Sequence, residues 1–278
     1  MLLLIGLFIG LILGLTGAGG SVFAVPLLLL LGGMPMADAT GISLGAVAAT
    51  TFYASLRNSV SRKQVPLLWK PGLILALSGA LTAPLGKWLG MQLDELWLVS
   101  GFSLLAAIIA LRMWMSARNN PQAASVVRAG NFAATPSPDH LCNLNPTGQF
   151  ELRPRCVTGL LIGGLVVGLL SGLFGVGGGF LIVPLLLALS AVSMAQAVST
   201  SLFIIALISS SGFISHVALS ENQHWDWLLL VAAGGLVGMM IGQAVSHKIA
   251  NVWLQKLFAI GLLIAAGAMF FSTALTPS

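Results

Sequence analysis

The stretch Gly172–Pro184, which reads GLFGVGGGFLIVP, decides how this chain folds. A second copy, Gly14–Pro26 (GLTGAGGSVFAVP), lies 158 residues earlier, and each copy interrupts a long apolar segment. An interior Gly costs a helix about 1 kcal/mol relative to Ala, so both clusters predict a break in a helix. Inside a membrane, the backbone groups freed by a break must bond to protein or to water in a cavity. Two matched breaks are typical of a transporter's binding site.

The composition identifies a polytopic, all-helical membrane protein. The chain has 278 residues, of which 57% are hydrophobic and only 7% are charged, whereas soluble domains average about 25% charged residues. Several continuous apolar runs reach the roughly 20 residues that cross a bilayer as a helix. A β-barrel would show short alternating segments instead. The net charge of +5 comes from basic residues beside these runs, so we attribute it to membrane orientation and expect no nucleic-acid partner.

The predicted helices fall into two similar halves. Leu2–Leu31 would be about 45 Å long as one helix, too long for a simple crossing, so two half-helices around Gly17–Gly20 are expected. The first repeat is predicted at residues 1–116, a polar linker at 117–154 and the second repeat at 155–278. The other expected helices are Met36–Arg57, Pro66–Leu89, Asp94–Met115, Met194–Leu219, Trp225–His247 and Asn251–Thr273, with a second broken element at Cys156–Leu189 and a polar turn at Ser59–Gln64.

Matches between the halves extend beyond the Gly clusters and predict an internal duplication. At the same offset of 158, Gly6, Gly10, Gly14, Met36, Ala37, Ala39, Ser43 and Leu44 match Gly164, Gly168, Gly172, Met194, Ala195, Ala197, Ser201 and Leu202. After a slip of two residues, Gly79 and Gly86 match Gly235 and Gly242.

The distribution of basic residues bears on topology. If each broken element crosses the membrane, the halves are parallel and the basic residues divide nine to three. If each broken element turns back, the halves are inverted and the division is eleven to one, with Lys87 alone on the minority side. The positive-inside rule favours the inverted arrangement over the parallel one. Both arrangements leave the linker cytoplasmic, and they place the termini on opposite sides.

The duplicated Gly motif, with Thr200-Ser201-Leu202 or Ile42-Ser43-Leu44 in the following helix, resembles the sulfite exporter TauE/SafE family of membrane permeases. The resemblance covers both halves. It implies a secondary transporter of the bacterial inner membrane for sulfite, sulfonates or related small sulfur-containing anions. Ser21 and Ile42 depart from the fuller motif of the second half, where Gly179 and Thr200 stand, so the two halves are expected to contribute unequally.

The predicted substrate site combines backbone N–H groups at the breaks with small hydroxyls on the next helix, because both can bind an anion. An alternative for the hydroxyls is a bond to their own helix. The spaced glycines from Gly6 to Gly14 and from Gly164 to Gly172 are expected to pack helices closely instead. The substrate-binding candidates are Gly17, Gly19, Gly20, Ser21, Ser43, Gly175, Gly177, Gly178, Gly179, Ser199, Thr200 and Ser201.

Four other polar residues are candidates for gating or anion attraction: Arg57, Asn58, His216 and Gln243. For Arg57 and His216, interfacial anchoring is the favoured interpretation. No nucleophile set or metal-ligand spacing occurs, so neither an enzyme nor a cofactor or metal is expected, and Cys142 and Cys156 are interpreted as incidental. We expect alternating access at a mid-membrane site between the breaks; the alternatives are an anion channel or a scaffold without transport. The sequence is compatible with a coupling proton or ion and with assembly into a homo-oligomer, but it specifies neither.

Overall fold

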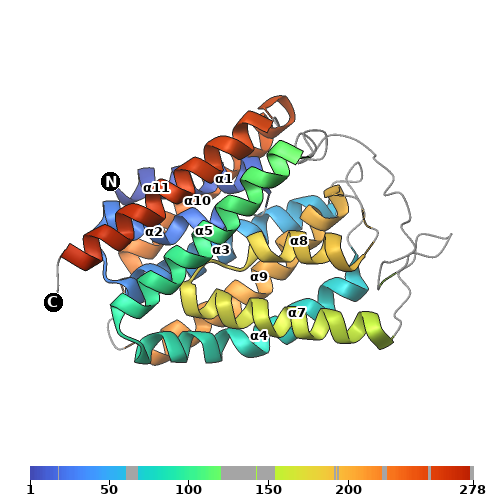
Figure 1. The fold of residues 1–278 in the computed structure, drawn as a ribbon, viewed down its shortest axis with the longest axis horizontal. Coiled ribbons are helices and arrows are strands. Elements are labelled where there is room, and N and C mark those ends of the chain that lie inside the picture. Colours follow the sequence, from blue (N-terminus) through green and yellow to red (C-terminus); the bar gives the residue numbers. More distant parts are fainter. Residues whose placement is uncertain are drawn as a thin grey trace.

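The computed structural model describes residues 1–17, 19–60, 68–119, 142, 154–190, 192, 194–220, 224–249 and 252–275. This part of the chain is all-helical, with ten α-helices and one short 3-10 helix (Figure 1). The elements are α1 (Leu2–Thr16), η1 (Gly19–Phe23), α2 (Ala24–Gly32), α3 (Met36–Val60), α4 (Trp69–Gln92), α5 (Glu95–Asn119), α7 (Pro154–Phe174), α8 (Gly179–Leu189), α9 (Met194–Leu219), α10 (Trp225–Ile249) and α11 (Val252–Leu275).

Both predicted breaks are present. Gly17, with φ 81°, ends α1, and its N–H donates to the carbonyl of Leu13 at 2.8 Å. Gly175, with φ 70°, follows α7 in the same way and donates to Ser171 at 2.9 Å. The predicted helices agree closely with those observed, apart from their ends: α3 continues through Ser59 and Val60, which we had assigned to a turn, and α5 continues to Asn119. Pro66 and most of the linker lie outside the described residues.

The spaced glycines pack helices together, as predicted. A Cβ at Gly6, Gly10 or Gly14 of α1 would overlap the backbone of α10 at Val231, Gly235 or Met239. A Cβ at Gly164, Gly168 or Gly172 of α7 would likewise overlap the backbone of α4 at Leu75, Gly79 or Ala83. The same step along both partners means that α1 runs parallel to α10, and α7 parallel to α4. Only Gly allows the two backbones to come this close, so the positions of the glycines determine that α1 pairs with α10 and α7 with α4.

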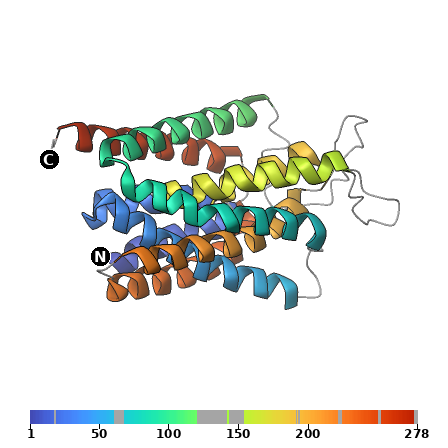
Figure 2. The same ribbon diagram turned by 90° about the horizontal axis from the view of Figure 1, so that it is seen from below.

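Helices α3 and α9 are packed together in the middle of the bundle (Figure 1) and run antiparallel, while α5 and α11 lie side by side along one edge (Figure 2). Gly41 of α3 contacts His216 near the end of α9, while Asn58 near the end of α3 contacts Ser199 near the start of α9. Gly45 and Gly235 contact Leu228 and Thr50, so α10 runs parallel to α3. It follows that α1 and α3 share one direction, and the chain turns back through η1 and α2 between them.

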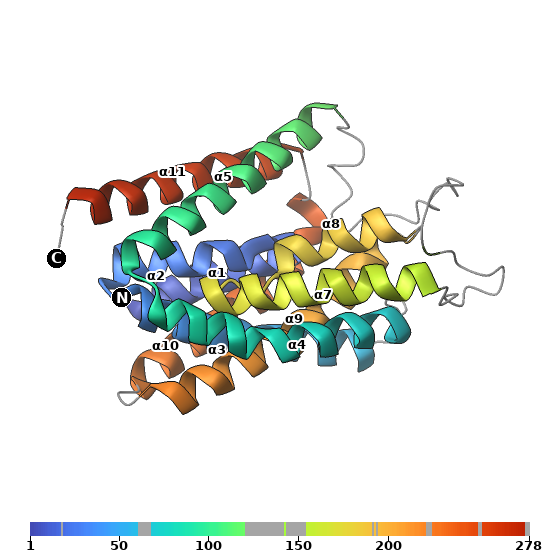
Figure 3. The ribbon, with the colours of Figure 1, turned by 60° about the horizontal axis from the view of Figure 1, so that its bottom comes forward.

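The two ends of the bundle differ in charge. The N-terminus and the end of α11 lie at one end, and the end of α5 and the start of α7 lie at the other (Figures 1 and 3). Seven basic residues belong to helix turns at the second end: Arg57, Lys70, Arg112, Arg118, Arg155, Lys248 and Lys256. Within the described helices, Lys87 is the one basic residue toward the end that holds the termini, because it lies in the last turns of α4.

Length and composition alone make five of the described helices long and apolar enough to cross a bilayer. These are Met36–Asn58, Trp69–Gln92, Pro154–Phe174, Gln196–Leu219 and Trp225–Val245. The outer surface of the bundle carries many exposed Leu, Ile and Phe side chains, such as Leu81 and Phe271. An apolar outer surface of this kind suits a protein that faces lipid. The protein is therefore an integral membrane protein.

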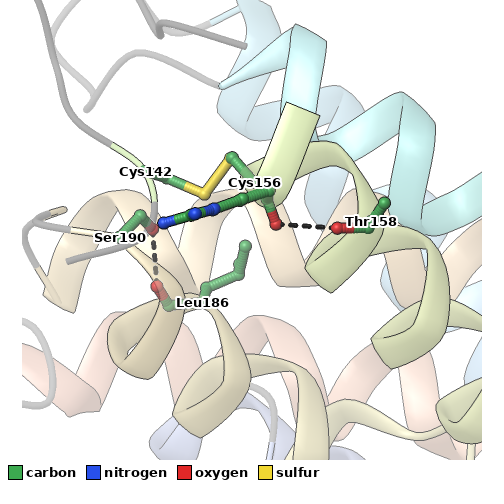
Figure 4. The surroundings of a disulfide bond; sticks show 6 residues. Cys142, Cys156, Thr158, Leu186 and Ser190 are labelled. Carbon is green, nitrogen blue, oxygen red and sulfur yellow. Dashed lines mark hydrogen bonds between the residues drawn. A yellow bond between two sulfur atoms is a disulfide. The ribbon is translucent and has the colours of Figure 1, made fainter. Parts of the chain in front are cut away.

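Cys142 and Cys156 form a disulfide, with their Cα atoms 5.1 Å apart (Figure 4). The N–H of Cys142 also donates to the carbonyl of Leu189 at 2.9 Å, so this residue is attached to the start of α7 and the end of α8. Our interpretation of the two cysteines as incidental was wrong. Spacing within a polar segment does not reveal which Cα atoms come close enough to pair, because that distance is set by the tertiary fold.

Candidate functional site

The second break is held in a backbone conformation that only glycine adopts readily. Gly175, Gly177 and Gly178 have φ of 70°, 70° and 69°, in the left-handed region where a Cβ costs roughly 1–2 kcal/mol. All three residues are buried. Gly178 is the N-cap of α8, and no side chain caps that helix start. The sequence therefore builds an irregular, buried backbone segment directly before a helix N-terminus.

Helices from both halves surround this break without room for side chains. A Cβ at Gly175 would lie 2.5 Å from the Cα of Thr40 on α3. At Gly177 it would lie 2.8 Å from the Oγ of Ser209 on α9 and 2.9 Å from the Cγ1 of Val47 on α3. Contacts this short essentially never occur, so any larger residue must displace α3 or α9. The break is thus in contact with the central helix pair.

Backbone donors at the second break lack partners. Across the described residues, the N–H groups of Val176, Gly177 and Gly178 donate to no acceptor, whereas Gly175 uses its own to cap α7. Leu181 and Ile182 then donate to the carbonyl of Gly178, at 3.0 and 3.1 Å. Buried N–H groups almost always find a partner in folded proteins. Three consecutive buried donors beside a helix N-terminus are therefore suited to an anion or ordered water.

Ser43 binds the second break directly. Its Oγ lies in α3, is fully buried, and donates to the carbonyl of Gly175 at 2.6 Å. The prediction that this hydroxyl faces a Gly break is therefore met, although the break is the one in the other half. In the conformation described, the proton of Ser43 is used by the protein backbone. The hydroxyl keeps its oxygen lone pairs for another donor.

Lys87 lies beside the same group and was missing from our candidates. Only 2% of its surface is exposed, and its Nζ donates to the Ala37 carbonyl at 2.9 Å and to Thr40 Oγ1 at 2.7 Å. Thr40 in turn contacts Gly175. The sequence did carry a signal: Lys87 follows Gly86 inside an apolar helix, and an ionisable residue within a membrane span is a functional candidate by default. Our charge count used it only as a marker of topology.

The first break collects a different set of residues. Gly17 lies against Val198 of α9, Gly20 packs onto Leu13, and Ser21 is fully buried. Gly19 begins η1, and Gly179 begins α8 at the other break.

The predicted hydroxyls of α9 lie near the start of that helix, at the end that contacts the first break. Ser199 Oγ accepts from Asn58 Nδ2 at 3.4 Å, and Thr200 Oγ1 accepts from the N–H of Leu68 at 3.2 Å. Ser201 bonds to Val198 of its own helix at 2.8 Å.

The two breaks start at opposite ends of the α3–α9 pair and meet between them. Gly17 contacts Val198 near the start of α9, whereas its counterpart Gly175 contacts Thr40 near the start of the antiparallel α3. Further along the chain, η1 of the first break and α8 of the second are in contact with each other. The predicted binding residues therefore extend from both ends of the pair toward its middle.

The remaining candidates are dispersed. Arg57 is exposed at the end of α3, as anchoring predicts. His216 is only 7% exposed; its ring fills the space beside Gly41, and its Nδ1 lies 3.1 Å from Ser220 Oγ. A hollow of about 20 Å³ beside His216 has room for little more than a water molecule. Gln243 is buried at the contact between α10 and Gly14 of α1.

Sequence comparison connects this arrangement with known proteins. The model of the family described as Sulfite exporter TauE/SafE matches residues 2–269, which is nearly the whole chain. The chain belongs to the TauE/SafE family. Both Gly breaks and the central helix pair lie within the matched region. This TauE/SafE protein is a membrane transporter by family, and not an enzyme.

Curated relatives of this TauE/SafE protein align along almost their full length. A "Probable membrane transporter protein" of Xylella fastidiosa is 30% identical over 95% of this chain and 91% of its own. YunE of Bacillus subtilis, with the same description, is 26% identical over 95% and 94%. One from Haemophilus influenzae is 26% identical over 96% of both chains. No solved structure matches the chain.

Proposed function

We propose that this protein is a secondary transporter that carries sulfite, sulfonates or related small sulfur-containing anions by alternating access. The observation that carries the proposal is the second break, where three buried N–H donors without partners adjoin the start of α8. Such donors bind an anion without a permanent ion pair, which lets the anion leave again. The description of the family as sulfite exporters supports the substrate class.

We also propose that the two halves are inverted repeats. Several contacts come in pairs related by the offset of 158. Gly41–His216 corresponds to Ser199–Asn58, and Gly175–Thr40 corresponds to Gly17–Val198. A two-fold axis across the bundle would produce both these pairs and the antiparallel course of α3 and α9. The return of the chain between α1 and α3 supports broken elements that turn back within the membrane.

The distribution of charge supports an orientation for the bundle. The end with the seven basic residues would face the cytoplasm, and the two termini would face outward. Homologues from bacteria support placement in the bacterial inner membrane. In this arrangement the Lys87 side of the second break lies nearer the outer surface. The first break then lies nearer the cytoplasm.

Alternating access would use the seam between α3 and α9. Each break contacts this pair toward an opposite end, so rocking one half against the other would open the two groups of donors to opposite sides in turn. The seam is narrow: Gly41, Gly45 and Gly177 are places where a Cβ would meet the opposing helix or break at under 3 Å. Small changes in packing there would alter access, since packed interfaces switch between discrete arrangements.

The test is flux through the purified protein in liposomes, with sulfite, sulfate, thiosulfate, small sulfonates and carboxylates as solutes. We expect saturable, selective uptake of a sulfur-containing anion. Large currents that rise linearly with concentration would indicate an anion channel instead. If the folded protein moves none of these anions, the proposed function is wrong, and a scaffold or a different solute becomes the better account.

A further inference from the structure

Lys87 is a buried cation whose close partners are neutral. Its Nζ has hydrogen bonds to Ala37 and Thr40, and among the described residues it forms no ion pair. Asp38, which is half-buried, and His216 are the titratable groups close enough to interact with it electrostatically. A charge in such a place is expensive unless something compensates it, and intramembrane charges usually mark a pathway for ions or substrates.

The surroundings of Lys87 join it to the second break. Thr40 accepts the hydrogen bond from Lys87, and the Cα of Thr40 lies where a Cβ on Gly175 would collide with it. Three residues before Thr40, Ala37 lies between Lys87 and a surface hollow of about 180 Å³. Gly90 and Met91, one turn beyond Lys87 on α4, also line this hollow. Its volume equals that of about six waters at roughly 30 Å³ each, which is enough for a small oxyanion with some of its hydration.

Glu95 is the one acidic residue on the wall of this hollow. Its Oε1 accepts a hydrogen bond from the N–H of Met36, at 3.3 Å, at the first residue of α3. The carboxylate therefore lies at a helix N-terminus, where the helix dipole balances part of its charge. Lys87 does not line the hollow; its Nζ is bonded to Ala37 and Thr40 on the buried side of the wall. The positive charge therefore lies deeper in the protein than the carboxylate of Glu95.

We propose that Lys87 supplies the positive charge that binds the transported anion at the second break. On binding, the anion would take over hydrogen bonds that Lys87 now gives to Thr40 and Ala37, next to the free N–H groups of Val176–Gly178. This inference rests on the proposed function and adds a requirement to it. Substrates must carry at least one negative charge, because a neutral molecule of the same shape leaves Lys87 uncompensated.

The equivalent position in the second half is neutral. With the slip of two residues that aligns Gly86 with Gly242, Lys87 corresponds to Gln243. The structural positions agree: a Cβ at Gly172 would lie 2.9 Å from the backbone N of Lys87, and a Cβ at Gly14 would lie 2.9 Å from that of Gln243. One half of the bundle therefore holds the charge. The protein should bind one charge-selective anion per chain.

The experiment compares two probes of nearly the same shape, methanesulfonate and dimethyl sulfone, which differ in charge. Binding is measured by calorimetry and flux in liposomes, for the native protein, Lys87→Gln and Lys70→Gln. Lys70 is the matched control, because it is an exposed lysine on the same helix. We expect the native protein and Lys70→Gln to bind methanesulfonate and to reject the sulfone. In Lys87→Gln, methanesulfonate affinity should fall about ten- to a hundredfold, as expected for a charged hydrogen bond, and the preference over the sulfone should vanish.

The possible outcomes distinguish the role of Lys87 from the proposed transport function. Unchanged affinity and charge preference in folded Lys87→Gln would overturn the inference while native flux still supported the transporter. Binding with this charge preference but without flux would reject the proposed function and leave the role of Lys87 standing. No binding and no flux in the native protein would reject both. If Lys87→Gln does not fold, Thr40→Val replaces it; an unchanged charge preference there would also overturn the inference, since Thr40 holds the Nζ in place.

Discussion

Ser43 of α3 donates a hydrogen bond to the carbonyl of Gly175, at 2.6 Å, and so connects the first half of the chain to the break in the second. Its repeat counterpart, Ser201, bonds instead to Val198 within its own helix, at 2.8 Å. Two serines at equivalent sequence positions therefore do different things. The halves are unequal at the point where each central helix passes a Gly break.

This difference predicts unequal effects of the same substitution. Ser43→Ala would leave the buried Gly175 carbonyl without its donor, a loss of about 1–3 kcal/mol of stability. We expect lower thermal stability in detergent and at least severalfold slower anion flux. Ser201→Ala is the control and should change both by much less, because its hydroxyl only bonds back to its own helix. Equal effects of the two substitutions would contradict the assignment of Ser43 to the break.

Gly177 is predicted to tolerate no side chain. Leu at this position would face strain at φ 70° and collide with Ser209 and Val47. We expect Gly177→Leu to abolish flux in liposomes and to lower the melting temperature, since overpacking alone costs about 1–3 kcal/mol. Gly267→Leu is the matched control, because nothing lies within 4 Å of a Cβ added at Gly267. Normal flux through Gly177→Leu would rule out the second break as the site.

The glycine stripe of α7 predicts a position-dependent cost of adding one methyl group. At Gly172 a Cβ would overlap the backbone carbonyl of Ala83, whereas at Gly163 it would meet the end of the Leu185 side chain, at 2.5 Å. The backbone cannot move aside as a side chain can, so Gly172→Ala should destabilise the protein by about 1–3 kcal/mol and Gly163→Ala by less. Thermal unfolding of the two variants measures the difference. A larger loss for Gly163→Ala would mean that α4 and α7 do not approach as described.

The disulfide between Cys142 and Cys156 is predicted to stabilise the start of α7. It closes a loop of 14 residues, for which chain entropy gives about 3 kcal/mol. The double variant Cys142→Ala/Cys156→Ala should unfold at lower temperature, and a reductant should lower the melting temperature of the native protein but leave that of the variant unchanged. Non-reducing mass spectrometry of membranes from cells checks whether the bond forms there. The same result tests the proposed orientation, because disulfides are rare in the cytosol: a bond formed in cells would contradict the placement of the start of α7 on the cytoplasmic side. Free thiols throughout would count against the bond.

Local chemistry explains what was predictable here. Hydrophobic composition identifies a helical membrane protein because a bilayer core requires apolar spans with internal hydrogen bonds. Glycine clusters break helices wherever they occur, since the cost lies in the backbone itself, and α9 begins and ends where predicted, at Met194 and Leu219. The stripes from Gly6 to Gly14 and from Gly164 to Gly172 could be assigned to helix packing for the same reason, because small residues at helical spacing permit close contact.

Tertiary structure decided everything that depends on which helix faces meet. The sequence places Gly17 and Gly175 at equivalent positions of two similar motifs, but only the antiparallel course of α3 and α9 brings them to opposite ends of that pair. The sequence identifies Lys87 only as a basic residue at a membrane edge, whereas the tertiary fold buries its side chain and brings its Nζ to Thr40 of α3. The pairing of Cys142 with Cys156 likewise required α7 to begin beside the end of α8. Periodicity and composition are properties of neighbours in the chain, whereas distances between helices are set by the packing of the whole bundle.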